Sequence, residues 1–159
     1  MKSLVVYSSQ SGNTKKLAQA VADALPGEKE VVAVDGAPEK LDGVDLVAVG
    51  FWLMAGKPDP KSSEFLAGVA GKKVFLFATH GAAKGSAHAA AAMAHAVKIA
   101  AGAQVVGSFS CQGEVQAKVM ETARAKVPPP LWLADAPFAA GHPDATDIAA
   151  VKDAVLACL

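Results

Sequence analysis

The sequence predicts an α/β fold in which a doubly wound sheet of five parallel strands is covered by helices on both faces, giving three layers in a single domain over residues 1–159. Short apolar runs bounded by turn residues alternate along the chain with helix-like patterns, which is the rhythm of such a sheet. The composition, 52% hydrophobic and 19% charged residues, suits one compact domain with a sizeable core. There is no internal repeat.

The apolar runs that we interpret as strands are Leu4–Tyr7, Glu30–Val34, Leu46–Gly50, Lys73–Ala78 and Gln104–Ser110. The helix-like patterns are Thr14–Leu25, a short piece at Ser62–Val69, Ser86–Ala101, Glu114–Lys126 and Thr146–Ala157. Right-handed crossovers place the loops after the first, third, fourth and fifth strands on one edge of the sheet. Ligands of such folds bind at that edge.

A polar loop connects the first apolar run to the first helix pattern. Its residues are Ser9, Gln10, Ser11, Gly12, Asn13 and Thr14. Hydroxyl and amide side chains, backbone N–H groups and the positive end of a helix dipole all converge here on one point, and the glycine lets the backbone approach a ligand closely. We therefore expect a phosphate-binding loop, and the alternative is a plain helix cap.

The sequence of this loop shows which class of nucleotide-binding fold the chain resembles. The Walker pattern G-x-x-x-x-G-K-[ST] and the dinucleotide pattern G-x-G-x-x-G are both absent. The segment Ser9–Thr14 matches the pattern [TS]-x-[TS]-G-N-T in full, and through it the chain resembles the flavodoxin family. The resemblance implies the strand order 2-1-3-4-5, a phosphate loop that holds the phosphate of FMN, and two further loops that hold the flavin ring.

The second of these loops follows the third strand and is rich in large apolar side chains, which are costly on a loop unless something covers them. Its candidate residues are Phe51, Trp52, Leu53, Met54 and Gly56. A planar flavin ring would cover them by stacking. The resemblance makes Trp52 the first stacking candidate, with Phe51 or Met54 as alternates, and makes the Gly56-Lys57 peptide a candidate for reorientation on reduction. The alternatives are that Phe51 or Trp52 folds into the core and that Gly56 forms a simple turn.

The third loop follows the fourth strand, and its candidate residues are Thr79, His80, Gly81 and Gly85. Small residues there let backbone amides reach the flavin ring. The tyrosine that many flavodoxins place in this loop is missing, because the only tyrosine is Tyr7. One flavin face is therefore either open or covered by His80. Cys111, after the fifth strand, is a further candidate neighbour of the cofactor, although a buried and inert thiol is the preferred interpretation.

Residues 127–144 form the least regular stretch of the chain. They include four large apolar residues that need burial, Leu131, Trp132, Leu133 and Phe138. We expect an ordered excursion that packs against the domain before the last helix. A partner surface is the alternative.

Charge, cysteines and histidines argue against other classes of protein. Lys plus Arg and Asp plus Glu both total 15, so we expect no nucleic-acid partner. The N-terminus turns polar at Ser8, too soon for a signal peptide or membrane span, and we expect a cytoplasmic protein without a membrane partner. Cys111 and Cys158 lack zinc-site spacing, and His88 and His95 have no acidic residue at helical spacing, so we expect no metal site.

These observations favour an FMN-binding electron-transfer protein in which the flavin carries the redox chemistry and no side chain is catalytic. We expect a monomer or weak dimer that serves a dedicated redox partner protein, either a reductase or an acceptor enzyme. Neutral net charge favours such a partner over promiscuous docking by an acidic face. Two alternatives stay open: an NAD(P)H-dependent FMN or quinone reductase, and a flavin-free interaction module with the same topology.

Overall fold

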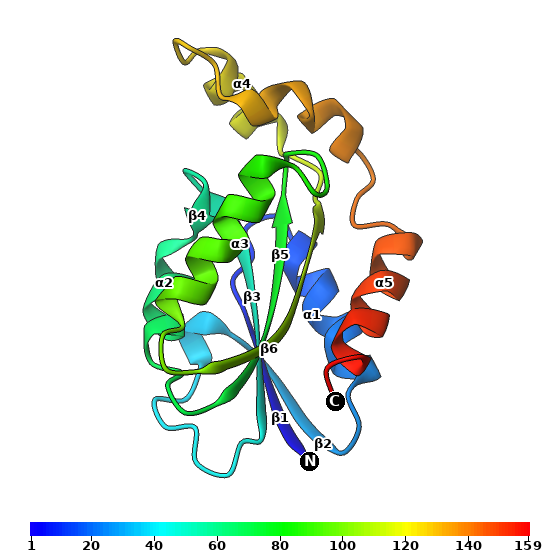
Figure 1. Ribbon diagram of the computed structural model, residues 1–159. Helices are drawn as coiled ribbons and strands as arrows, with labels where there is room; N and C mark the ends of the chain where they lie inside the picture. Colours follow the sequence, from blue (N-terminus) through cyan, green and yellow to red (C-terminus); the bar gives the residue numbers. More distant parts are fainter.

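The computed structural model describes residues 1–159, and a twisted parallel sheet forms its centre (Figure 1). The strands are β1 (Lys2–Tyr7), β2 (Glu28–Ala33), β3 (Leu46–Met54), β4 (Lys57–Pro58), β5 (Lys73–His80) and β6 (Gln104–Gln112). The order in the sheet is β2-β1-β3-β5-β6 with parallel pairing throughout, and the two-residue β4 pairs antiparallel with β3. Without β4 this is the expected order 2-1-3-4-5, so the predicted α/β fold is confirmed.

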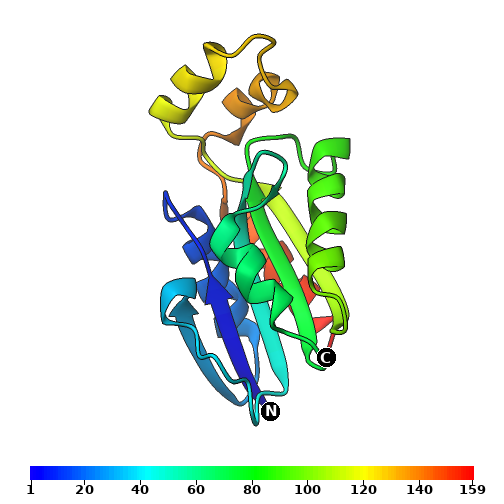
Figure 2. The same cartoon turned by 90° about the vertical axis from the view of Figure 1, so that its left-hand side faces the viewer.

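Helices cover both faces of the sheet, as Figures 1 and 2 show. The α-helices are α1 (Asn13–Ala24), α2 (Pro60–Ala67), α3 (Ala87–Ile99), α4 (Ala117–Arg124) and α5 (Ala145–Leu156). Short 3₁₀ helices are η1 (Val34–Gly36), η2 (Leu131–Ala134) and η3 (Ala136–Ala139). Helices α1 and α5 pack together on one face, and α2 and α3 pack on the other. No helix is long and apolar enough to cross a bilayer.

The alternation of side chains along β5 divides the interior into two cores. Phe75 and Phe77 are fully buried with residues of α1 and α5, whereas Leu76 and Ala78 are fully buried with residues of α2 and α3. Burying each of the larger side chains contributes roughly 1.5–3 kcal/mol. Because successive residues of a strand point to opposite faces, the same alternation sends Thr79 toward α1 and the next residue, His80, toward α3.

Strand β3 is longer than the sequence pattern predicted, and this corrects one interpretation. The expected strand ended at Gly50, but pairing with β5 continues to Trp52, and β3 turns back at Met54 into β4 as a hairpin. Phe51 therefore lies within the sheet and is fully buried in the core beside α2 and α3. Its expected place as an alternate stacking residue is wrong, because its ring is covered by protein.

The other predicted elements are present with shifts of a few residues at their ends. The largest change is in α4, which was expected over Glu114–Lys126 and spans only Ala117–Arg124. The short helix expected at Ser62–Val69 begins earlier, at Pro60, because the side chain of Asp59 accepts a hydrogen bond from the N–H of Ser62 and caps it.

Residues 113–144 leave the sheet after β6 and return at α5, and we call them the excursion. They include α4, η2 and η3, and they stand beyond the carboxyl edge of the strands, away from the two chain termini (Figures 1 and 2). The expectation that their large apolar side chains pack against the domain holds only in part. Trp132 and Leu133 are half-buried, but Leu131 is 92% and Phe138 77% exposed.

Candidate functional site

The phosphate-loop candidate lies between β1 and α1, at the carboxyl edge of the sheet. Gly12 precedes α1 with a φ of 93°, a conformation that a residue with a side chain rarely adopts. No side chain caps α1, and a Cβ at Gly12 would meet no atom within 4 Å. No hydrogen bond within the protein engages the N–H groups of Asn13, Thr14 and Lys15 in the first helical turn, where the positive end of the helix dipole lies. Such an end is a site for an anion.

The side chains of this loop divide into two groups. Gln10 and Ser11 are exposed, and no hydrogen bond to protein holds either side chain. Ser9 and Asn13 shape the loop instead. The Ser9 Oγ accepts a hydrogen bond from the N–H of Gly12 at 3.0 Å, and the Asn13 Nδ2 donates to the carbonyl of Glu114 at 3.0 Å.

Thr14 and Thr79 form a buried contact beneath the first and third loops. Their Oγ1 atoms are 2.9 Å apart, and the residues are 1% and 4% exposed. Thr79 is the next-to-last residue of β5 and faces α1, which brings it under the first turn of that helix. The hydrogen bond between these two predicted site residues therefore links the first loop to the third loop on the side that faces the core. Their hydroxyls have this structural role in addition to any contact with a ligand.

The second loop is the end of β3 and its hairpin turn. Trp52 is half-buried, and its indole Nε1 donates to the Ser8 Oγ at 3.2 Å, which holds the ring near the end of β1. The turn itself is made by Ala55, with a φ of 51°, and Gly56, with a φ of 73°. Gly56 thus has the role of the simple turn that the sequence left as an alternative.

The remaining apolar residues of that loop differ in their exposure. Met54 is 52% exposed at the end of β3, whereas Leu53 is partly buried against the core beside α2 and α3. The hairpin turn lies against α3, because a Cβ at Gly56 would come within 3.3 Å of the ring of His88. Met54 and Trp52 therefore remain the large side chains of this loop that are accessible to a ligand.

The third loop begins with a histidine that is 6% exposed. The Nδ1 of His80 lies 2.9 Å from the carbonyl of Ala82, so Nδ1 carries the proton and Nε2 is left as an acceptor. Nε2 is buried and has no hydrogen-bond partner. Burial lowers the pKa of His80 below its usual range, and nearby His88 lowers it further. His80 is too enclosed to cover a flavin face, so that interpretation is wrong.

Cys111 lies in the core under this edge of the sheet. It is fully buried with residues of α1 and α5, and burial raises the pKa of its thiol to about 12. A protonated, enclosed thiol is a poor nucleophile. The structure supports the preferred interpretation of Cys111 as an inert core residue.

The excursion contacts the first loop through the Glu114 carbonyl and the third loop through Trp132 and Asp135, and the sequence did not reveal these contacts. The Asp135 carboxylate accepts a hydrogen bond from the N–H of Ala83 at 2.9 Å, and the Gln112 side chain donates to the carbonyls of Gly81 and Asp135 at 3.1 and 3.2 Å. Trp132 packs so closely on Gly81 that a Cβ there would lie 3.2 Å from its ring. No local sequence pattern predicts these contacts, because the residues in contact are distant along the chain.

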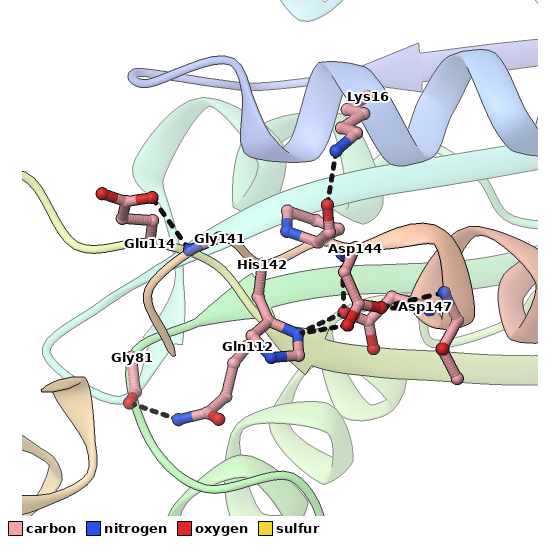
Figure 3. A network of polar contacts seen from close by, with 10 residues as sticks. Lys16, Gly81, Gln112, Glu114, Gly141, His142, Asp144 and Asp147 are labelled. Atoms are coloured by element: carbon pink, nitrogen blue, oxygen red, sulfur yellow. Dashed lines mark hydrogen bonds and ion pairs between the residues drawn. The ribbon is translucent and has the colours of Figure 1, made fainter. Parts of the chain in front are cut away.

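A polar network fastens the return of the excursion to α5, beside α1 (Figure 3). The Nδ1 of His142 lies 2.6 Å from the Asp147 Oδ2, and the Glu114 carboxylate accepts a hydrogen bond from the N–H of Gly141. Asp144 and Asp147 form a capping box at the start of α5. The backbone N–H of Asp147 lowers the pKa of the Asp144 carboxyl. The network explains how the chain re-enters the domain next to the phosphate-loop candidate.

Two surface hollows lie away from this edge. One of about 330 Å³ is bordered by Met1, Leu46 and Lys73, and one of about 410 Å³ is bordered by Val34, Lys61 and Phe65. Neither contains a residue of the three loops.

The sequence model of the flavodoxin domain matches residues 4–156. The chain belongs to the flavodoxin family. The flavodoxin-like domain-containing protein BilS of Clostridioides difficile (strain CD3) is 34% identical over 119 residues, which cover 72% of this chain and 68% of that protein.

Solved flavodoxins share the fold at low identity. Oxidised flavodoxin 2 from Bacillus cereus superimposes with a TM-score of 0.64 at 18% identity, covering 99% of this chain and 97% of that one. A flavoprotein in complex with FMN from Lactobacillus acidophilus NCFM gives a TM-score of 0.54 at 21% identity, covering 69% of this chain and 92% of that one. The expected family is confirmed.

Proposed function

We propose that the protein binds FMN at the carboxyl edge of its sheet and carries electrons for a dedicated redox partner protein. The observation that supports this most is the Ser9–Thr14 loop. In a chain of the flavodoxin family, it presents an uncapped helix N-terminus, a glycine with positive φ and free side chains to open space. The flavin, when bound, supplies the one- and two-electron chemistry that no side chain here can supply.

The residues present suit the two ends of such a cofactor. Ser11 and the first-turn N–H groups of α1 would receive the phosphate, since Ser11 is exposed and none of these groups has a hydrogen-bond partner in the protein. Trp52 would lie against the ring, with its indole held by Ser8. The buried and unpartnered Nε2 of His80 marks an acceptor at the end of β5 that the protein itself does not satisfy.

The chain's own residues would bind and orient the cofactor, and no acid–base group is required. Cys111 is protonated and enclosed, and the His142–Asp147 contact belongs to the start of α5. The protein would therefore hold the flavin in position, and Trp52 would exclude water from one face of its ring. Transfer to a partner requires that the remaining edge of the ring stays accessible.

A substitution in the loop tests the proposal because Ser11 has no role in the fold. Ser11→Ala removes an exposed hydroxyl without a hydrogen bond, so stability should be unchanged while the Kd for FMN, measured by quenching of flavin fluorescence, rises about five- to tenfold, equivalent to about 1–1.4 kcal/mol. Ser108→Ala, in an exposed serine of β6, is the matched control and should leave the Kd unchanged. Equal affinities of all three proteins for FMN would contradict the proposed loop.

The reaction with NADPH distinguishes the proposed electron carrier from the alternative, an NAD(P)H-dependent reductase. Anaerobic NADPH alone should leave the oxidised-flavin absorption of the reconstituted protein unchanged, because a carrier needs a separate reductase. Bleaching within seconds would instead make the protein a reductase and contradict the carrier role.

A further inference from the structure

Three large apolar side chains of the excursion point away from the domain, and we call them the docking face: Val127, Leu131 and Phe138. Their exposed fractions are 97%, 92% and 77%, the three highest among the exposed large hydrophobic residues of the chain. All three lie within a stretch of twelve residues, 127–138. Apolar side chains gathered on one short projecting segment are typical of an interaction site.

The charges around the docking face are unbalanced even though the whole chain is neutral. Lys118, Arg124 and Lys126 are exposed, and no ion pair engages them. The carboxylates of Glu114 and Asp135 accept hydrogen bonds from backbone N–H groups within the protein. Over residues 117–138, from the start of α4 to the docking face, the acidic residues are Glu121 and Asp135. In this stretch three basic residues oppose two acidic ones, and the Asp135 carboxylate faces inward to the N–H of Ala83, so the outward-facing charge is mainly positive.

The docking face is connected to the third candidate loop by side-chain packing and a hydrogen bond. Between Leu131 and Phe138 lie Trp132, which packs on Gly81, and Asp135, whose carboxylate binds the N–H of Ala83. The segment that presents the apolar side chains to solvent is thus fixed on its inner side to the third loop. A molecule bound to the docking face would be held next to the edge where the flavin is proposed to lie.

We infer that the docking face is the binding surface for a redox partner protein that offers an apolar groove with an acidic rim. This rests on the proposed function, because the partner is taken to exchange electrons with the flavin. The free cations favour an acidic partner. They disfavour a second copy of this chain, because a symmetric contact would bring the same cations together. Anionic membranes are recognised by clusters of about four to eight basic residues, and this segment has fewer.

Photo-cross-linking identifies what touches the docking face. A benzophenone amino acid is placed at position 131 or 138 of the full chain in its native host, and at position 159 as a control. Leu159 is 56% exposed and lies at the opposite end of the molecule (Figure 1). We expect one protein to be captured at both 131 and 138 and not at 159. Capture of a second copy of the chain, or of nothing, would overturn the inference.

Binding of the captured protein, once purified, then tests the surface directly. The double variant Leu131→Ser with Phe138→Ser should raise its Kd at least about tenfold, and Leu159→Ser should not change it. Raising the salt from low to high concentration should weaken binding, because the free cations are screened. An unchanged Kd for the double variant contradicts the docking face. Binding that does not depend on salt would also contradict it. Cosedimentation of the wild-type protein alone with vesicles containing phosphatidylserine would contradict it as well.

The flavin spectrum of the same proteins separates the two proposals. The double variant alters no residue of the three loops, so it should retain FMN as the wild type does. If the wild type fails to retain FMN, the proposed function is wrong while the cross-linking result still reports on the surface. If FMN is retained but the double variant binds the partner normally, only the docking face is wrong.

Discussion

Replacing Thr14 or Thr79 by valine tests how the first and third loops are held together. Valine has nearly the shape of threonine, so each change removes only the hydroxyl. The two Oγ1 atoms are 2.9 Å apart at residues that are 1% and 4% exposed, and a single replacement leaves one buried hydroxyl without its partner. Each single variant should lower the free energy of unfolding by about 1–3 kcal/mol, the cost of an unsatisfied buried polar group.

The double variant is expected to behave differently. Replacing both hydroxyls by apolar groups of the same shape leaves no orphaned group, so Thr14→Val with Thr79→Val should cost no more than about 1 kcal/mol. The cycle then gives a coupling energy of at least about 1 kcal/mol, in the direction that makes the double variant more stable than the sum of the singles.

Urea unfolding of the protein without ligand, followed by tryptophan fluorescence and circular dichroism, measures these energies by linear extrapolation. Thr122→Val is the matched control. Its hydroxyl donates to the carbonyl of Lys118 on an exposed face of α4, so its loss should cost less than about 0.5 kcal/mol. Additive single costs, or single variants as stable as the control, would refute the inference that the buried pair joins the loops.

Burial raises the pKa of the Cys111 thiol to about 12, so this thiol should resist iodoacetamide at pH 8.5 in the native protein, while half-buried Cys158 reacts. Detection of two modified thiols by intact-mass measurement would contradict this. Because the folded state keeps this proton to a higher pH than the unfolded state, stability is lost as pH rises from about 9 to about 12. The free energy of unfolding of the wild type should fall by about 1.4 kcal/mol more per pH unit than that of Cys111→Ala between about pH 9.5 and 11. Gly81→Ala should cost about 1–3 kcal/mol, because its Cβ would lie 2.8 Å from the Val115 Cγ2 and 3.2 Å from the ring of Trp132. Thermal unfolding without a change in Tm would count against the packing of the excursion on Gly81. Asp135→Ala removes the acceptor and should leave the Kd for FMN within about twofold but speed hydrogen exchange at the Ala83 amide, whereas unchanged exchange would argue against the contact.

The sequence was sufficient for the parts of the fold that rest on local pattern. The apolar run of β1, the polar loop and the start of α1 were all within two residues of their observed positions, because cap chemistry and hydrophobic periodicity act over a few neighbouring residues. Phe51 was misplaced for a related reason. A continuous apolar run from Leu46 to Met54 does not reveal where a strand ends, and an Ala-Gly turn lacks the Asn-Gly or Asp-Gly signature of a tight hairpin.

Contacts between distant residues had no signal in the sequence. Thr14 and Thr79 are 65 positions apart, and Asp135 meets Ala83 across 52 positions. His80 is buried because it is still part of β5 and its side chain points to the face covered by α3. The sequence pattern ended this strand at Ala78, so the direction of the His80 side chain could not be predicted. The exposure of Leu131 and Phe138 ran against their hydropathy, and such a conflict between composition and environment is characteristic of functional surfaces.

Binding of FMN is tested most directly by the absorption spectrum of the purified protein after addition of excess FMN and its removal by gel filtration. The account predicts oxidised-flavin bands at a ratio of about one FMN per chain. The bands should be shifted from those of free FMN, because the proposal places the ring against Trp52, and the shift should be smaller in Trp52→Leu. A protein that elutes without flavin bands would contradict the account and leave the Ser9–Thr14 loop as a helix cap or a site for another anion.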